Sequence, residues 1–165
     1  MKSENTIAAR IGALLLSKGK TMATAESCTG GNIAHLITLT PGSSAWYKGG
    51  VVSYATGVKI AVLGVSSELI DKHTVVSGQV AEAMADGVRR LTKADFAIST
   101  TGIAGPDGGD TENPVGTVWI GVATQHSVAS MRFIAGASRA ENIDKFSEAA
   151  LQYLFDNICA EPVSR

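Results

Sequence analysis

The segment 94–101 constrains the fold of this chain more than any other part of the sequence. It is nearly continuous in apolar and β-favourable residues. A strand with one face in water alternates apolar and polar residues, whereas a strand covered on both faces does not. We therefore expect a buried strand here, within a sheet that has helices packed on both faces.

Helical and strand-like segments alternate along the rest of the chain. Apolar residues at helical spacing predict helices at 4–18, after Gly31, near Lys59, at 66–72, 77–91 and 139–158. Further strands are expected at 21–25, around Val51 to Tyr54, and in a hairpin at 115–124 and 127–135. The 165 residues contain no linker or repeat. The sequence thus predicts an α/β fold: one three-layer domain over 1–165, with a mixed, mostly parallel sheet flanked by helices.

Composition excludes several classes of function. The formal net charge is -1, Lys and Arg are scattered, and aromatic residues make up 5%, so we expect no nucleic-acid partner. No apolar stretch approaches the roughly 18–20 residues that cross a bilayer, and the chain does not open on a signal-peptide pattern. The histidines and the two cysteines lack metal-ligand spacing. We expect a cytoplasmic protein with reduced thiols, no membrane association and no metal.

The first candidate for chemistry is the turn 26–31, between a strand and a helix. Backbone N–H groups at the start of a helix suit a phosphate or a developing oxyanion, and a hydroxyl or thiol there can act as a nucleophile. Ser27 and Cys28 are the candidate nucleophiles. Alternatively, Ser27 or Thr29 simply caps the helix.

A second candidate is Lys59, which stands in an apolar neighbourhood beside Val58 and Ile60. An exposed lysine is a poor base at neutral pH, but burial disfavours the ammonium and lowers its pKa. The alternative is a lysine whose amine reaches water. Tyr54, at the end of the preceding strand, could hydrogen-bond to a serine or lysine or merely pack its ring.

The third candidate is the glycine-rich loop that begins at Thr101 and Gly102. Glycines at this density let a backbone approach a ligand closely, although a purely structural turn explains them equally well. The loop matches neither a P-loop nor a dinucleotide-binding fingerprint.

Together these segments resemble the C-terminal domain of the CinA family. The resemblance rests on ATAESCTGG (23–31), PGSSAWYKGGVVSY (41–54), Lys59, TGIAGPDGG (101–109) and PVGTVWI (114–120), and it covers nearly the whole chain. Members include deamidases that hydrolyse nicotinamide mononucleotide to nicotinate mononucleotide and ammonia. The resemblance therefore implies an amidohydrolase with a small nucleotide substrate, no metal or other cofactor, and a homo-oligomeric state.

The resemblance also implies a role for each candidate residue. Ser27 is the nucleophile, Lys59 the general base and Tyr54 a hydroxyl that assists proton transfer. The predicted substrate-binding residues lie in the turn 29–31, at the start of the glycine-rich loop and in the last helix. They are Thr29, Gly30, Gly31, Thr101, Gly102 and Arg139. Ser27 is favoured over Cys28 because no histidine is placed to lower the pKa of the thiol.

Two departures from the family pattern leave other functions open. Thr56 replaces an asparagine that active members carry, and the segment 143–145 lacks a second arginine expected after Arg139. Lysine does not reproduce a bidentate arginine contact with phosphate. The alternatives are a non-catalytic paralogue that binds a nucleotide or a protein, and an amidase for a different carboxamide.

Overall fold

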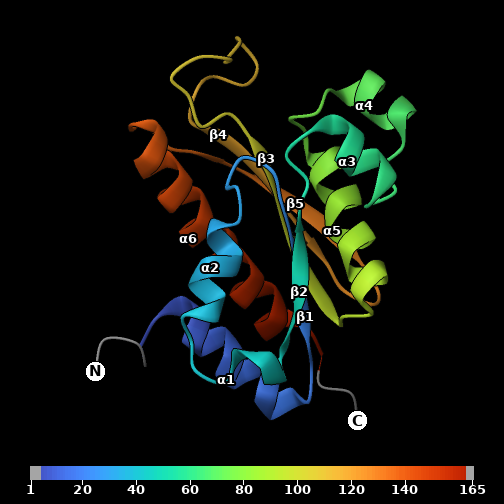
Figure 1. The fold of residues 1–165 in the computed structure, drawn as a ribbon, viewed down its shortest axis with the longest axis vertical. Helices are drawn as coiled ribbons and strands as arrows, with labels where there is room; N and C mark the ends of the chain where they lie inside the picture. The colour runs from blue at the N-terminus through green and yellow to red at the C-terminus, as the bar shows by residue number, and fades with distance from the viewer. Residues whose placement is uncertain (1–4, 163–165) are drawn as a thin grey trace.

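Five strands form the middle layer of the fold (Figure 1). They are β1 (Met22–Glu26), β2 (Tyr47–Val52), β3 (Phe96–Gly102), β4 (Thr117–Ala123) and β5 (Val128–Ile134). The computed structural model describes residues 5–162 and orders the strands β2-β1-β3-β4-β5. β1 pairs in parallel with β2 and β3, whereas β4 pairs antiparallel with β3 and β5. All strands but β4 therefore run in one direction, which confirms the mixed, mostly parallel sheet.

Helices cover both faces of this sheet (Figure 1). One face carries α1 (Ile7–Lys18), α2 (Asn32–Thr38) and α6 (Arg139–Ala160), and the other carries α5 (Gly78–Thr92) with the shorter α3 (Thr56–Ala61) and α4 (Ser67–His73). A single 3₁₀ turn, η1 (Ser43–Ala45), precedes β2. The predicted three-layer α/β architecture is confirmed.

The central strands are buried because each contributes side chains to two separate cores. Every residue of β1 is buried, as is β3 up to Thr101. Within β3, Ile98 packs into the core beneath α1, α2 and α6, while its neighbour Ala97 packs into the core beneath α5. On the α5 side, a Cβ on Gly121 would collide with the carbonyl of Ala81, so this glycine lets the helix lie close against β4.

Most element boundaries lie within a few residues of those predicted, and two differences have clear causes. The first helix starts at Ile7, whereas residue 4 was predicted. It starts there because the Thr6 side chain caps it by accepting from the N–H of Ala9. Residue 4 itself lies outside the described residues. The strand predicted around Val51 begins earlier, at Tyr47, and ends before Tyr54. It includes Gly50, where a Cβ would collide with the side chain of Thr24 on β1.

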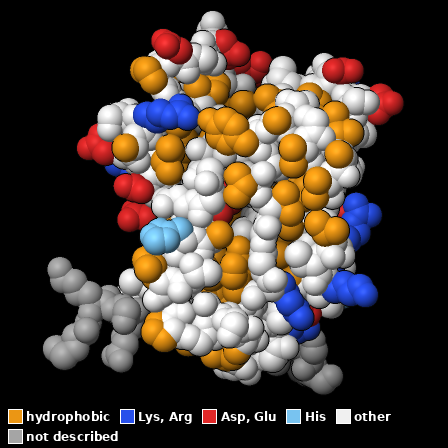
Figure 2. Space-filling view, viewed as in Figure 1, with side chains coloured by type: hydrophobic (Ala, Val, Ile, Leu, Met, Phe, Trp, Pro, Cys, Tyr) orange, Lys and Arg blue, Asp and Glu red, His pale blue; other side chains and the backbone are white. Residues whose placement is uncertain are grey.

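The surface agrees with the scattered charges of the sequence. On the face shown in Figure 2, Lys and Arg side chains stand apart among apolar and uncharged ones, and they form no basic patch on that face. Across residues 5–162, no helix combines the length and apolar character required to cross a membrane.

Candidate active site

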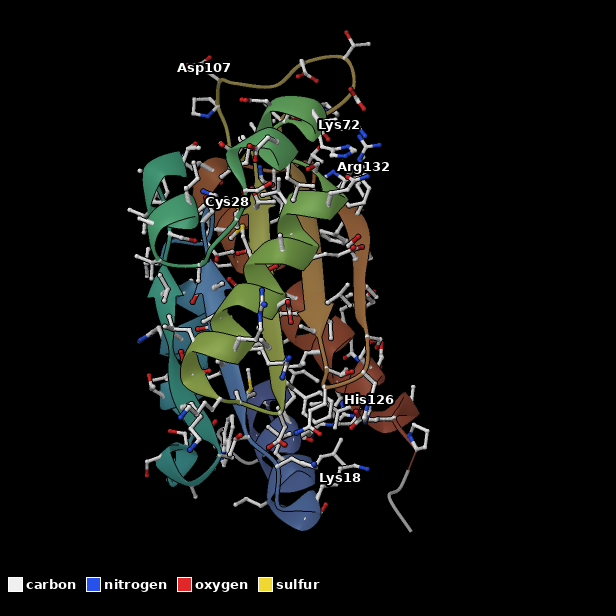
Figure 3. The ribbon with its side chains drawn as sticks, turned by 90° about the vertical axis from the view of Figure 1, so that its right-hand side faces the viewer. Lys18, Cys28, Lys72, Asp107, His126 and Arg132 are labelled. Atoms are coloured by element: carbon white, nitrogen blue, oxygen red, sulfur yellow. The ribbon has the colours of Figure 1, made fainter. Side chains whose placement is uncertain are left out.

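The predicted site residues converge at the carboxyl ends of β1, β2 and β3. Parallel strands bring their carboxyl ends to one edge of a sheet, where α/β proteins commonly bind ligands. A cleft of about 280 Å³ lies there. Its lining consists of most of 101–108 together with Ser27, Cys28, Tyr54, Thr56, Lys59, Val75, Val76 and Arg139. Figure 3 shows Cys28 at this end of the sheet and Asp107 on the loop above it.

Lys59 and Ser27 form the centre of the cleft. The Lys59 side chain is only 1% exposed, although it is a lysine on a short helix. Its Nζ donates to Ser27 Oγ at 2.9 Å and to the backbone carbonyls of Ser53 at 2.7 Å and Tyr54 at 3.2 Å. The amine therefore does not reach water, as a surface lysine would, but is held against the serine hydroxyl.

Burial weakens the preference of the Lys59 amine for its charged form. Burial lowers the pKa of the Lys59 ammonium below its ordinary value. None of the ion pairs among residues 5–162 involves Lys59. A charged Lys59 donates to all three partners. A neutral amine has two N–H groups and one lone pair, so the two carbonyls can still accept the N–H groups while the Ser27 hydroxyl donates to the lone pair. This geometry suits a general base acting on Ser27.

The backbone holds Ser27 in place on both sides. Its N–H donates to the carbonyl of Thr100 on β3 at 3.0 Å, and its carbonyl accepts from the N–H of Gly30 at 3.0 Å. The serine is thus fixed by the neighbouring strand and by its own turn. Fixed groups need little reorganisation before reaction.

Glu26 organises the turn that follows the serine. Glu26 is 1% exposed, and its carboxylate accepts from the N–H groups of Gly31 at 3.1 Å, Ile33 at 3.0 Å and Ala34 at 2.8 Å. It also accepts from the Thr29 hydroxyl at 2.6 Å. This negative charge meets the positive end of α2 and satisfies N–H groups that a helix start leaves unpaired. Sequence reasoning assigned Glu26 no role.

The predicted substrate-binding turn is consequently revised. Thr29, Gly30 and Gly31 do not line the cleft, and the N–H groups of Gly30 and Gly31 already have partners in Ser27 and Glu26. Glu26 occupies the position at the start of α2 that sequence reasoning gave to an anionic ligand. Within the described chain, the backbone N–H of Thr29 has no partner.

The cleft lining includes three of the predicted substrate-binding residues, namely Thr101, Gly102 and Arg139. Each of them also contacts other parts of the fold. The Thr101 hydroxyl donates to the carbonyl of Val75 at 2.8 Å, which fixes the segment before α5. A Cβ on Gly102 would collide with the carbonyl of Thr117, so strand packing alone requires this glycine. The Arg139 guanidinium donates to the carbonyl of Gly105 and to the Tyr54 hydroxyl.

The two departures from the family pattern fall in different places. Thr56 is exposed and lines the cleft. Ile143 packs against the core beneath α6, and Lys145 lines a separate groove between α1, α2 and α6. Lys145 therefore does not supply the second cation, and the described cations that line the cleft are Lys59 and Arg139. Among residues 5–162, no cluster of three potential metal ligands occurs.

Cys28 has the properties of a structural thiol. Burial raises the pKa of Cys28 to about 12, so the thiol stays protonated at neutral pH. We expect iodoacetamide at pH 7.5 to modify the exposed Cys159 and leave Cys28 largely unmodified in the native protein, as measured by peptide mass spectrometry. Urea-unfolded protein is the control, in which both thiols should react. Rapid modification of native Cys28 would contradict this assignment.

Comparisons with known proteins agree with this fold. The CinA C-terminal domain matches residues 4–158. CinA-like proteins of Flavobacterium psychrophilum and Chloroherpeton thalassium are 48% and 51% identical over 157 and 145 residues, covering 95% and 86% of this chain. These matches cover 38% and 34% of the relatives, so the chain spans about a third of the length of the curated relatives it matches.

Solved structures show the same architecture. The competence damage-inducible protein A of Klebsiella pneumoniae superposes with a TM-score of 0.91 at 31% identity, covering 94% of this chain and 97% of that one. The competence/damage inducible protein CihA of Agrobacterium tumefaciens has a TM-score of 0.88 at 38% identity, covering 91% and 92%. On the combined evidence of motifs, fold and relatives, the chain belongs to the CinA C-terminal domain family.

Proposed function

We propose that this chain is a serine–lysine amidohydrolase that hydrolyses the carboxamide of nicotinamide mononucleotide to nicotinate mononucleotide and ammonia. The observation that carries the proposal is the 2.9 Å contact between the buried Lys59 amine and the Ser27 hydroxyl, in a cleft that also contains a guanidinium. A serine hydroxyl is a weak nucleophile until an adjacent base takes its proton. Serine–lysine pairs are a recognised variant of that arrangement.

The reaction begins with attack of Ser27 Oγ on the carboxamide carbon, while neutral Lys59 accepts the hydroxyl proton. The resulting ammonium returns this proton to the carboxamide nitrogen, the carbon–nitrogen bond breaks and ammonia leaves. Water then attacks the acyl-serine ester as Lys59 takes a proton from the water. The proton passes to Ser27 Oγ, the ester bond breaks, and the carboxylic acid product loses its proton to solvent and leaves as the carboxylate.

The oxyanion formed in each step needs hydrogen-bond donors close to Ser27. The N–H groups of Gly30 and Gly31 already have partners, and Thr29 does not line the cleft. Cys28, the residue after Ser27, does line it, and among residues 5–162 its N–H donates to no backbone carbonyl. We assign the Cys28 N–H as an oxyanion donor. An N–H that is fixed before the reaction stabilises the developing charge by a few kcal/mol, on the order of 2.7–4 in mutagenesis of such sites.

The pH dependence of the reaction follows from the lowered pKa of Lys59. Neutral amine is the reactive form, so kcat/KM should rise with pH through the Lys59 pKa and level off above it. We expect the midpoint below the ordinary lysine pKa of about 10.4. The check is ammonia release from pH 6 to 10 by the wild type and by the exposed variant Lys72→Met, which should give the same profile. A midpoint at the ordinary lysine value would contradict the assignment of Lys59.

The test of the proposed substrate is a product analysis. Purified protein should convert nicotinamide mononucleotide into ammonia and nicotinate mononucleotide in equal amounts. A rise in melting temperature with the nucleotide but no ammonia would indicate a binding protein instead, since a ligand of the folded state stabilises it. Ammonia from other carboxamides, but none from this nucleotide, would indicate a different amidase.

A further inference from the structure

Tyr54 presents its backbone and its side chain to different parts of the cleft. Its carbonyl accepts from Lys59 Nζ at 3.2 Å, on the side where the preceding Ser53 is fully buried. Tyr54 as a whole is 59% exposed, and its hydroxyl accepts from Arg139 Nη2 at 3.0 Å. The part of Tyr54 that contacts the base is therefore the peptide group, whereas the phenol contacts the guanidinium.

The Lys59 amine has no free position for the Tyr54 hydroxyl. Nζ is bonded to its own carbon and has three hydrogen-bond partners, namely Ser27 Oγ and the carbonyls of Ser53 and Tyr54. Four neighbours complete the tetrahedral geometry of an amine nitrogen. The hydroxyl could join the base only by displacing one of these partners and leaving Arg139.

Arg139 is held from two directions. Nη1 donates to the carbonyl of Gly105 at 2.6 Å, on the loop after β3, and Nη2 donates to the Tyr54 hydroxyl, after β2. The ion pairs among residues 5–162 do not include Arg139, so no carboxylate neutralises it there. A guanidinium has five N–H donors, and two such contacts fix its plane while other donors remain for an anion.

From this arrangement we infer that Tyr54 is a positioning residue for Arg139 and a determinant of specificity for phosphorylated substrates. The inference rests on the proposed function. Tyr54 and Gly105 fix the guanidinium so that it binds the phosphate of the nucleotide, and the Tyr54 O–H remains free to donate to the same phosphate. The phenol takes no part in proton transfer between Ser27 and Lys59.

The experiment compares nicotinamide mononucleotide with nicotinamide riboside, which keeps the carboxamide but lacks the phosphate. Tyr54→Phe should raise KM for the nucleotide about tenfold and leave kcat nearly unchanged, so that kcat/KM falls about tenfold. This is the effect expected when a contact to a charged group is lost. It should change kcat/KM for the riboside less than about twofold, and the pH profile should not move. Tyr47→Phe, which removes a hydroxyl bonded to Thr24 outside the cleft, is the matched control and should affect neither substrate.

A double variant separates positioning from chemistry. In an Arg139→Ala background, Tyr54→Phe should have much less effect on the nucleotide, because the residue that it positions is gone. An equal loss of kcat on both substrates, or a full tenfold effect that persists without Arg139, would overturn the inference. So would an unchanged KM for the nucleotide in Tyr54→Phe.

A binding measurement keeps this inference distinct from the proposed reaction. Calorimetry on the Ser27→Ala protein should show that Tyr54→Phe weakens binding of the nucleotide about tenfold and leaves binding of the riboside unchanged. This result is independent of turnover. If the wild type released no ammonia but Tyr54→Phe weakened binding of the nucleotide alone in the Ser27→Ala protein, the amidase proposal would fail and the role of Tyr54 would stand. Equal effects on the two compounds would refute the role of Tyr54.

Discussion

Lys59→Met is expected to lower ammonia release from nicotinamide mononucleotide by at least about a thousandfold, because nucleophile and base act as a unit. Methionine keeps an unbranched chain of similar length but cannot accept the Ser27 proton. The Lys59 amine is buried and bonded to Ser27 Oγ, and among residues 5–162 no other side chain forms a hydrogen bond with that oxygen. The measurement is kcat for the variant against the wild type, at a pH on the plateau of the wild-type profile.

The control for this variant is Lys72→Met, which removes an exposed lysine from α4. We expect it to keep the wild-type rate. Circular dichroism should show that both variants are folded, because Lys59→Met leaves the carbonyls of Ser53 and Tyr54 without this donor and some stability will be lost. A folded Lys59→Met protein that retained a tenth of the wild-type rate would exclude Lys59 as the base.

Glu26→Ala should cause the largest loss of stability among the predicted variants, about 3 kcal/mol in the free energy of unfolding. The substitution removes the acceptor from the backbone N–H groups of Gly31, just before α2, and of Ile33 and Ala34 in its first turn, and from the Thr29 hydroxyl. The Ile33 N–H and the Thr29 hydroxyl are buried, so water cannot easily replace the carboxylate there. Urea unfolding at pH 7 measures the difference from the wild type.

Ser66→Ala is the matched control for loss of a helix cap. Ser66 caps α4 by accepting from the N–H of Leu69 at an exposed position, where water can substitute. Its loss should lower stability by about 1 kcal/mol or less. If Glu26→Ala were no more destabilising than Ser66→Ala, the buried carboxylate would not be the element that holds the turn after Ser27.

The fold could be predicted from the sequence because local pattern and burial agree along most of the chain. The apolar segment 94–101 predicted the central strand. Because a strand buried on both faces must be covered on both sides, it also predicted helices on both faces of the sheet. β2 was harder to place because Gly49 and Gly50 resemble a turn when seen locally. Gly50 belongs to the strand because its missing Cβ makes room for Thr24 of β1, a contact between residues far apart in the sequence.

The site could be predicted only in part. Ser27 and Lys59 were identified by a combination of motif and resemblance, and the structure brings their side chains together. The partners of these residues could not be read from the sequence, because they come from separate strands and loops. The clearest case is Glu26. It belongs to the segment 23–31, but its role arises only because the start of α2 places the N–H groups of Ile33 and Ala34 against its carboxylate.

The wall formed by Val75 and Val76 is a second case that the sequence does not reveal. These residues follow a short helix and have no distinctive pattern. They reach the cleft because Thr101 donates to the carbonyl of Val75 and Asn113 donates to that of Val76. Both bonds join the segment before α5 to the glycine-rich loop region, across a large separation in sequence.

The most direct test of a Ser27-centred amidase is ammonia release from nicotinamide mononucleotide by the wild type and by Ser27→Ala, measured side by side on folded protein. Cys28→Ala is measured in the same series, because it changes the neighbouring candidate nucleophile. We predict steady turnover by the wild type, a rate within a few-fold of it for Cys28→Ala, and background release for Ser27→Ala. Turnover that survives in Ser27→Ala, or its absence in the wild type, would contradict the account.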